Sequence, residues 1–308
     1  MRDTSADHGV PASELGLRPV ALRQVGGLIF VNLGAAPITP PLSPLKGGEG
    51  AYNNADAVRE WEAAEAVLGP ALKPQGLERA RTAARRDYLV AANWKLVWEN
   101  NRECLHCPTA HKEYIQANYD IHLGDASREA EIAQRTRECA AAWATKGLEA
   151  PSLKSDMSAS WYRANRTPLR PGWVSETLDG RQAAPLMGAY PDAEVGTLRL
   201  TAFPSFWMHG SCDHAVTTRV APLGPMLTRV SVYWLVDAKA GEGSDYSLDA
   251  LMPFWQRTSE QDWGLVENVQ KGVLSRAYAP GPLSKSREYN VAQFIDWYLG
   301  RLGAGTDS

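Results

Sequence analysis

The sequence predicts an α+β fold, in which an antiparallel sheet and long helices occupy separate stretches of the chain. Residues 196–237 contain β-branched and aromatic runs divided by turn residues at Gly210–Asp213 and Gly224–Pro225, as in an antiparallel meander. From Asp249 to Lys271 the apolar side chains change to helical spacing. Grouped strands with long helices at intervals favour α+β over a doubly wound sheet.

The N-terminal elements are predicted from shorter signals. Residues 17–34 indicate two short strands separated by the sequence QVGG, and a Pro/Gly-rich connector follows. Residues 56–66 indicate a helix that Asp56 could cap and Gly69 could end.

The middle of the chain adds two more helical stretches. Residues 84–100, ARRDYLVAANWKLVWEN, indicate a strand that runs into a helix. Residues 129–149 are rich in alanine and charge, which indicates a helix or a loosely ordered segment.

The stretch 249–271 is compatible with one long helix, whose apolar positions are Leu251, Phe254, Trp255, Trp263, Leu265, Val266 and Val269.

Composition excludes several classes of function. The 308 residues allow one large or two small domains, and the net charge of −3 gives no electrostatic case for nucleic acid. The polar start MRDTSADHGV is not a signal peptide, and the longest apolar run is broken by prolines, so no membrane span is expected. Four scattered cysteines are too few for a disulfide framework, which favours a reducing, cytoplasmic setting.

Residues 99–114, ENNRECLHCPTAHKEY, concentrate metal-binding groups and allow three interpretations. The histidines could satisfy local hydrogen bonds while the cysteines fill the core. Cys104, Cys107 and His111 could instead bind structural zinc, although a closed zinc site needs a fourth ligand and usually a second pair. Finally, His106 and His111 could bind non-haem iron(II) together with a carboxylate from elsewhere in the chain.

The spacing of the two histidines constrains the third interpretation. Positions five apart on an ideal helix diverge by about 140°, so His106 and His111 could not easily share a metal on one straight helix. Pro108 lies between them and should kink or end the helix, which could bring His111 back beside His106. Glu103, about 60° from His106 on such a helix, is expected near the metal.

At these residues the chain resembles the α subunits of Rieske non-haem iron oxygenases. The segment 93–111 is similar to the family's iron-binding motif of an acidic residue, two positions, His, four positions and His, which Glu103, His106 and His111 fill. The segment 258–278 is similar to the family's ligand-bearing C-terminal helix, with Asp262 at the ligand position. The resemblance implies a mononuclear Fe(II) held by two imidazoles and a carboxylate, which leaves positions open for O2.

The resemblance covers the chain from about residue 17 and implies its fold and domains. The expected catalytic domain, residues 37–308, is a helix-grip (START/Bet v1-like) fold, in which an antiparallel sheet wraps against the long C-terminal helix. Residues 1–36 resemble the end of a Rieske domain.

Within this family, the chain most resembles the branch that oxidises quaternary ammonium compounds, such as glycine betaine and stachydrine demethylases. The residues that carry this are the segments 93–104, 203–216, 253–267 and 280–284. The resemblance implies N-demethylation with release of formaldehyde. Eleven tryptophans are consistent with a cation–π cage for a trimethylammonium group, with Trp161, Phe206 and Trp207 as its expected walls.

The chain departs from the family at its N-terminal part. Family members bind a [2Fe–2S] cluster through a Cys-x-His and a later Cys-x-x-His pair, but no cysteine precedes residue 104 and no Cys-x-x-His occurs. The chain is therefore expected to begin inside a Rieske domain and to lack cluster ligands. By resemblance, the protein works with a reductase in a homotrimer or a mixed trimer with a full-length subunit, where Glu103 bridges one subunit's iron to its neighbour's cluster.

Two alternatives remain open at this stage. The same iron chemistry could act on an aromatic acid or ring, which a basic residue near the iron would favour. A third hypothesis is a non-catalytic domain that keeps the helix-grip cavity without redox function, and iron binding separates it from the two enzyme hypotheses.

Overall fold

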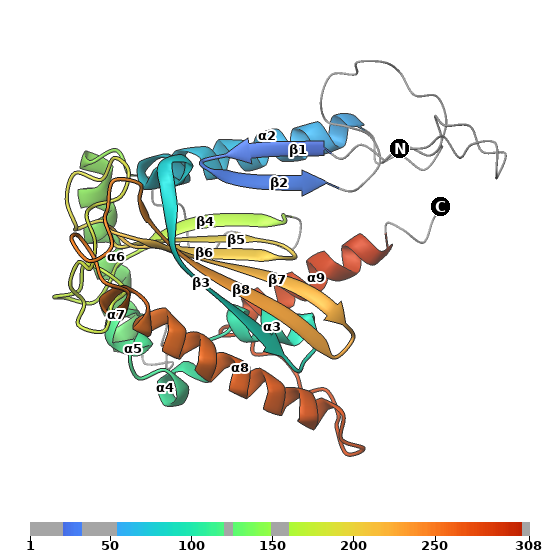
Figure 1. Ribbon diagram of the computed structural model, residues 1–308. Coiled ribbons are helices and arrows are strands. Elements are labelled where there is room, and N and C mark those ends of the chain that lie inside the picture. The colour runs from blue at the N-terminus through green and yellow to red at the C-terminus, as the bar shows by residue number, and fades with distance from the viewer. Residues whose placement is uncertain (1–20, 33–53, 120–125, 149–159, 304–308) are drawn as a thin grey trace, which may run out of the picture.

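The computed structural model describes residues 21–32, 54–119, 126–148 and 160–303 (Figure 1). Its centre is a six-stranded sheet of order β3-β8-β7-β6-β5-β4, in which every neighbouring pair is antiparallel. The strands are β3 (Ala80–Val90), β4 (Tyr162–Thr167), β5 (Thr197–Ala202), β6 (Phe206–Gly210), β7 (Ala215–Gly224) and β8 (Leu227–Asp237). The order β5 to β8 is the predicted meander, and the α+β prediction is confirmed.

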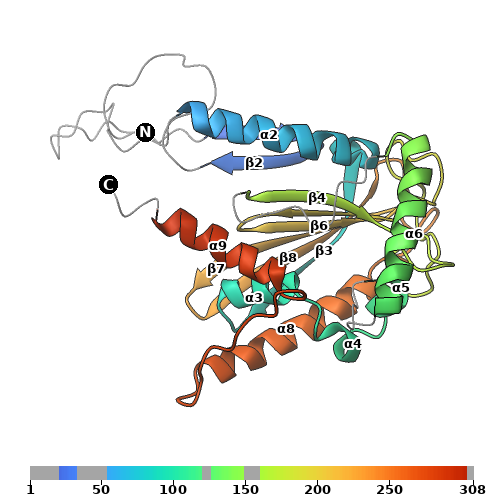
Figure 2. The same ribbon diagram turned by 180° about the vertical axis from the view of Figure 1, so that it is seen from behind.

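The two faces of the sheet carry different elements (Figures 1 and 2). Helix α2 (Asn54–Leu72) and the hairpin β1 (Ala21–Val25) and β2 (Leu28–Asn32) cover one face. Helices α3 (Trp94–Arg102), α8 (Pro253–Val273) and α9 (Tyr289–Gly303) lie on the other, and α6 (Ala126–Thr145) stands at one end. The short elements are η2 (Lys73–Gln75), η3 (Leu77–Arg79), α4 (Cys107–Ala110), α5 (Tyr114–Ala117) and α7 (Leu248–Leu251).

Each face of the sheet has its own hydrophobic core, because successive side chains of a strand point to opposite sides. Leu198, Leu200 and Met208 pack with Leu68 and Leu72 of α2. On the other face, strand residues such as Val232 and Trp234 belong to one core with Trp98 of α3, Phe254 of α8 and Phe294 of α9. The second core is the one that reaches the histidine segment.

Several predicted elements are confirmed. The first two strands form an antiparallel hairpin through Gly26 and Gly27, whose φ values of 51° and 83° suit a two-residue turn. The strand and helix predicted at 84–100 are β3 and α3, and residues 129–149 are mostly helical, as part of α6. Within the described residues, none of the helices has the length and apolar character needed to cross a bilayer.

Other boundaries differ from the prediction. Helix α2 begins before Asp56 and continues through Gly69 and Pro70 to Leu72. Leu68, Ala71 and Leu72 at this end are at most 1% exposed, so tertiary packing outweighs the unfavourable helix propensity of Gly and Pro.

The C-terminal helical stretch is also divided differently from the prediction. It consists of α7 and α8, separated at Met252, and Pro253 occupies the first position of α8. Strand β4 and helix α9 are two elements that were not predicted from the sequence. The proposed domain boundary at residues 36 and 37 lies outside the described residues.

Candidate metal centre

The histidine segment leaves helix α3 earlier than the sequence predicts. Asn93 caps α3, with its side chain accepting a hydrogen bond from the backbone of Lys95, and the helix ends at Arg102. Glu103 is already extended, and Pro108 lies in the first turn of the new helix α4. The expectation that a helix would kink or end at Pro108 was therefore wrong, because proline is well tolerated in a first helical turn.

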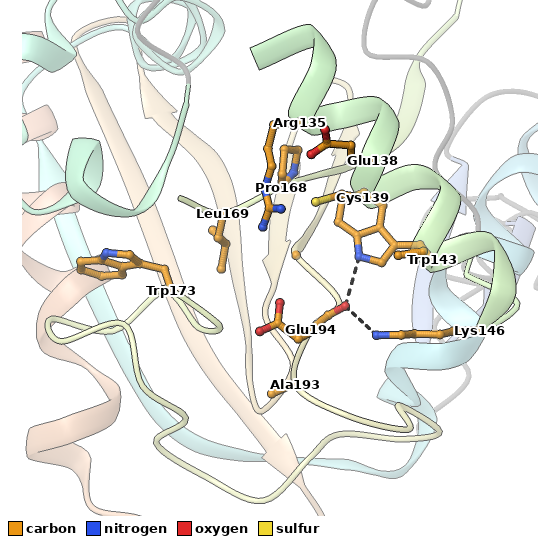
Figure 3. Close-up of a pocket in the computed structure, with 12 residues that line it drawn as sticks. Arg135, Glu138, Cys139, Trp143, Lys146, Pro168, Leu169, Trp173, Ala193 and Glu194 are labelled. Carbon is orange, nitrogen blue, oxygen red and sulfur yellow. Dashed lines mark hydrogen bonds between the residues drawn. The ribbon is translucent and has the colours of Figure 1, made fainter. Parts of the chain in front are cut away.

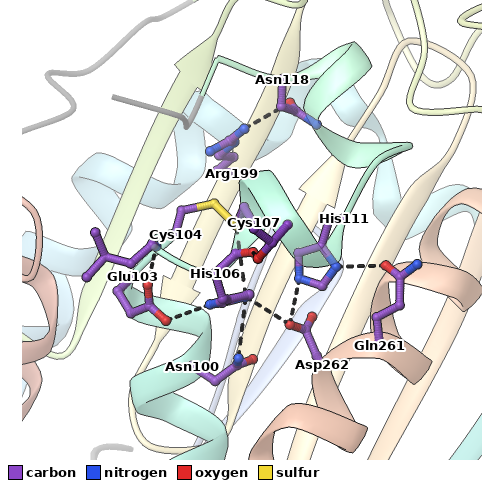
Figure 4. Close-up of a disulfide and its surroundings, with 12 residues drawn as sticks. Asn100, Glu103, Cys104, His106, Cys107, His111, Asn118, Arg199, Gln261 and Asp262 are labelled. Atoms are coloured by element: carbon purple, nitrogen blue, oxygen red, sulfur yellow. Dashed lines mark hydrogen bonds and ion pairs between the residues drawn. A yellow bond between two sulfur atoms is a disulfide. The ribbon is translucent and has the colours of Figure 1, made fainter. Parts of the chain in front are cut away.

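This path brings three predicted ligands together (Figure 4). His106 Nε2 lies 3.2 Å from Asp262 Oδ1, and His111 Nε2 lies 2.9 Å from the same oxygen. The two imidazole rings are nearly perpendicular, with their centroids 5.0 Å apart. Asp262 lies on α8, 151 residues after His111 in the sequence. The packing of α8 against the rest of the domain therefore brings this carboxylate beside the two histidines.

The other nitrogen of each imidazole is fixed by a second side chain. His106 Nδ1 donates to Glu103 Oε1 at 2.6 Å, and His111 Nδ1 donates to Gln261 Oε1 at 2.8 Å. Both Nδ1 atoms carry the hydrogen of the neutral imidazole, and both Nε2 atoms face Asp262. In a neutral imidazole of this tautomer, Nε2 has the free lone pair that a metal requires. Sequence reasoning found Glu103 but missed Gln261, which no spacing signal marks.

The electrostatics of the centre also favour cation binding. Burial lowers the pKa of His106, but hydrogen bonds and charges from Asp262 and Glu103 outweigh it and raise the pKa to about 9. Burial likewise opposes a charge on His111, but Asp262 raises its pKa overall. Burial raises the pKa of Asp262, whereas both histidines lower it below its ordinary value overall. The centre therefore stabilises positive charge beside an ionised carboxylate.

The donor set fits a divalent transition metal. Two imidazole nitrogens and one carboxylate oxygen are the facial set of non-haem Fe(II) proteins. Cys107 Sγ also lies near, 3.9 Å from His106 Nε2, but it forms a disulfide with Cys104 and so is not a thiolate. The zinc interpretation through Cys104 and Cys107 therefore finds no support in this arrangement, because cysteine binds zinc as a thiolate and these two sulfurs are joined to one another.

The expected aromatic walls do not all lie on the face of the histidines. Phe206 packs in the core beneath α2, since strand alternation turns it away from the face of its neighbour Trp207. Trp207 contacts Trp98 of α3. Trp161 stacks with Trp61 of α2, at a centroid distance of 6.2 Å.

Two other aromatic rings connect to the centre instead. The Tyr114 ring lies 6.3 Å from that of His111, and the Trp255 ring lies 5.8 Å from that of Tyr114. Trp255 precedes Asp262 by seven residues on α8, which places both side chains on one side of the helix. Trp255 appeared in the predicted helix as an apolar position but was not recognised as a site residue.

A separate cavity of about 150 Å³ lies against α6 (Figure 3). Its walls include Cys139 and Trp143 of α6 and the backbone near Glu194, whose carbonyl accepts from Trp143 and Lys146. None of the residues lining this cavity is a predicted metal ligand, so it is distinct from the histidine centre.

The sequence and the site place the chain in a known family. Residues 77–304 match the family described as ring hydroxylating alpha subunit (catalytic domain), and the chain belongs to it. The match contains the whole histidine segment and Asp262.

Two curated relatives are similar to nearly the whole of this chain. The chain is 36% identical over 306 residues to the "Glycine betaine monooxygenase oxygenase subunit" of Chromohalobacter salexigens, a match that covers 95% of this chain and 62% of the relative. It is 33% identical to the protein of the same name from Pseudomonas aeruginosa strain UCBPP-PA14, covering 94% of this chain and 62% of the relative. The chain thus spans about 62% of the length of these relatives.

Solved structures support the fold. The quaternary ammonium Rieske monooxygenase CntA, in complex with an inhibitor, superposes with a TM-score of 0.57 at 14% identity, covering 97% of this chain and 66% of that chain. A second CntA structure, titled for insights into carnitine oxidation and inter-subunit electron transfer, gives 0.57 at 13% identity over 97% and 66% of the two chains. The mixed sheet and helix architecture is therefore that of Rieske oxygenase catalytic domains.

Proposed function

We propose that the chain contributes the mononuclear iron centre of an oxygenase that N-demethylates a quaternary ammonium compound such as glycine betaine. His106, His111 and Asp262 hold the Fe(II), and residues 37–308 form the catalytic domain. The observation that carries the proposal is the convergence of two Nε2 atoms on one Asp262 oxygen, within 3.2 Å, in a chain of this family. When bound, the iron supplies oxygen activation for attack on an unreactive C–H bond.

The residues around the centre have two proposed roles, which are to orient the imidazoles and to contact the substrate. Glu103 and Gln261 hold the two imidazoles in the orientation that presents Nε2 to the metal. Tyr114 and Trp255 offer aromatic faces beside His111, where a trimethylammonium group would gain cation–π stabilisation of about 0.5–2 kcal/mol. These two rings replace Trp161 and Phe206 as the proposed walls, because neither of those has a ring contact with the histidines.

The substrate class rests on the relatives. The chain is 36% and 33% identical to two proteins named for glycine betaine. A betaine loses a methyl group as formaldehyde after oxidation of one N–CH3 carbon, and no aromatic ring takes part. The names of these two relatives favour a betaine over the aromatic-acid alternative.

Electrons must reach the iron from outside this centre. The chain's cysteines do not fit a [2Fe–2S] cluster, because Cys104 and Cys107 are joined to one another while Cys139 and Cys212 lie apart on α6 and after β6. We propose that electrons come from a reductase through the cluster of a neighbouring subunit in a homotrimer or mixed trimer. Glu103, whose side chain is 18% exposed, would bridge the two centres. A cytoplasmic location is part of the same proposal.

Formaldehyde release tests the proposal directly. Hydrogen peroxide supplies oxygen and electrons together, so the iron-loaded chain with peroxide and glycine betaine should yield dimethylglycine, formaldehyde and water. Formaldehyde should be stoichiometric with dimethylglycine and absent in Asp262→Ala. Hydroxylated product from benzoate, with none from glycine betaine, would favour the aromatic alternative instead.

A further inference from the structure

A disulfide lies inside the histidine segment and encloses one of the proposed metal ligands. Cys104 and Cys107 are joined across a sequence separation of three, with their Cα atoms 5.0 Å apart. Leu105 and His106 are the two residues between them. Cys-x-x-Cys is the spacing of many redox-active pairs. Opening or closing this bond therefore acts directly beside His106, as Figure 4 shows.

The disulfide also withholds a metal-binding sulfur from the centre. Cys107 Sγ lies 3.9 Å from His106 Nε2, and the ligand atoms of His106, Cys107 and His111 all lie within 4.8 Å of one another. Ligand atoms on one tetrahedral ion are about 3.3–3.6 Å apart when the metal–nitrogen and metal–sulfur bonds are about 2.0–2.3 Å long. Side-chain shifts of about 1 Å would therefore place all three donors on one ion.

The two sulfurs differ in how easily a reductant reaches them. Cys107 is 4% exposed, whereas Cys104 is only partly buried and its neighbour Leu105 is 45% exposed. Because thiol–disulfide exchange depends on access, an incoming thiolate should bond to Cys104 Sγ. The S–S bond then breaks with its electron pair on Cys107 Sγ, next to His106. A second reductant thiol displaces Cys104, so that two thiols are oxidised to one disulfide while both cysteines are reduced.

We propose that reduction of the Cys104–Cys107 bond turns the proposed iron centre into a second, thiolate-containing metal site, in which Cys107 Sγ binds the same ion as His106 and His111. This inference rests on the proposed function and adds a regulation of that centre. When Cys107 binds the ion, its thiol proton is released to the solvent.

The added sulfur changes which metal the centre selects. Imidazole and carboxylate donors suit Fe(II), whereas a thiolate is a soft ligand that selects Zn(II). The sulfur also occupies a position that the three-ligand set of His106, His111 and Asp262 leaves open for O2. The closed disulfide thus keeps the centre in its iron form, and the open dithiol gives a zinc form, so that the bond couples metal content to the thiol–disulfide balance.

Anaerobic Co(II) titration of the full 308-residue chain tests this without turnover. Cobalt substitutes for iron and zinc, and a bound thiolate gives it a charge-transfer band in the near ultraviolet. The metal-free chain is prepared either oxidised with diamide or reduced with a phosphine that is then removed. The chain has four cysteines, so a thiol count after denaturation checks both preparations. Reduced chain should show the band, and oxidised chain should bind Co(II) without it. Zn(II) should also displace Fe(II) more readily from the reduced chain.

Three serine variants assign the sulfur. Cys104→Ser leaves Cys107 without its disulfide partner, so it should show the band without any reduction. Cys107→Ser should bind Co(II) but show no band after reduction. Cys139→Ser, which changes a free cysteine on α6, is the matched control and should behave as wild type in both preparations. Circular dichroism confirms that each variant is folded.

The outcomes separate this inference from the proposed function. Reduced wild-type chain that binds Co(II) without the band, or a band retained in folded Cys107→Ser, would overturn the thiolate site and leave the proposed iron centre standing. Binding of no metal by either preparation would overturn the proposed centre, and the thiolate site with it. If Cys107→Ser does not fold, the two wild-type preparations and Cys104→Ser decide alone.

Discussion

The orientation of each imidazole in the proposed metal centre depends on the side chain that accepts a hydrogen bond from its Nδ1. Gln261 accepts from His111 Nδ1, and Glu103 accepts from His106 Nδ1, so neither ring can turn its Nδ1 toward the metal without losing a hydrogen bond. The two acceptors differ in charge, because Glu103 is a carboxylate and Gln261 is a neutral amide. A hydrogen bond to an ionised carboxylate is stronger than one to an amide. Iron affinity should therefore be sensitive to both.

The first prediction at the residue scale concerns Gln261. Replacing Gln261 with Leu removes the acceptor of His111 Nδ1 and should weaken Fe(II) affinity about 10–100-fold, measured by anaerobic titration. Gln261→Glu keeps an acceptor and should retain most of the affinity. Gln256→Leu, on the exposed side of the same helix, is the control and should change nothing. Equal affinity in Gln261→Leu and wild type would show that this bond does not orient the ring.

The second prediction concerns pH. The raised pKa of His106, about 9, and the raised pKa of His111 mean that Nε2 protons must leave before a metal can bind. Metal affinity should therefore fall as pH falls from 8 to 6, by about tenfold per pH unit for each proton displaced. Titrating Co(II) in weakly buffered solution should also release protons, visible with an indicator dye. A pH-independent affinity would contradict this.

At the scale of elements, α9 packs against α3, next to the histidine segment. Phe294 of α9 lies within ring-contact distance of Trp94 and Trp98 of α3 and of Phe203. Because Phe294 is 1% exposed, Phe294→Ala should lower the free energy of unfolding by about 3–5 kcal/mol, measured by urea denaturation. Leu299 of the same helix is 56% exposed, and Leu299→Ala should cost less than about 0.5 kcal/mol. A small cost for Phe294→Ala would mean that α9 contributes little to this core.

A buried carboxylate fixes the turn between β6 and β7. Asp213 accepts from Ser175 Oγ, His214 Nδ1 and the backbone N–H of Ala183 and Ala184. Burial raises the pKa of Asp213, but these donors and the charge of His214 outweigh it and lower the pKa below 3.8. The stability that this group contributes is present above its unfolded pKa and is lost as pH falls through the lower folded pKa.

The corresponding variant is Asp213→Asn, in which the amide nitrogen cannot accept the backbone hydrogen bonds. It should be less stable than wild type at pH 7, by about 3 kcal/mol or more. Its unfolding free energy should also change less with pH below about 4 than that of wild type. Chemical denaturation at pH 3, 4 and 7 measures both effects, and parallel pH curves for the two proteins would argue against an ionised Asp213.

The sequence predicted the elements whose signals are local. Turn residues at Gly210–Asp213 and Gly224–Pro225 delimit β6 to β8, and apolar spacing identifies α8. Strand β4, with the polar sequence YRANRT, gives no such signal because its polar side chains are satisfied by distant partners, as Arg163 is by Asn290. The end of α3 at Arg102 also depends on a distant partner, since Arg102 bonds Thr201 of β5.

The same distinction applies to the site. His106, His111 and Asp262 were recognised through the resemblance of two segments, and the structure brings them together. Gln261 was missed because its contact with His111 arises only when segments 150 residues apart in the sequence pack together. Phe206 was misplaced because a single residue of alternation decides which face of β6 a side chain occupies.

At the scale of the whole molecule, the proposed function places iron binding in this chain and electron supply in a neighbouring subunit. The 308-residue polypeptide, purified and reconstituted with iron and sulfide, should show no visible absorption of a Rieske cluster, because its cysteines do not form the two Cys/His pairs that such a cluster needs. It should also show no steady demethylation with NAD(P)H and a reductase. Adding a full-length subunit whose own iron ligands are replaced should restore turnover that depends on Glu103. Turnover by the chain alone would contradict this route.

The most direct test of the account is an anaerobic Fe(II) titration of the metal-free chain beside His106→Ala, His111→Ala and Asp262→Ala. The account predicts one tightly bound iron per wild-type chain and loss of that iron in each of the three variants, while circular dichroism shows all four proteins folded. One iron retained in folded Asp262→Ala, or no iron in the wild-type chain, would contradict it.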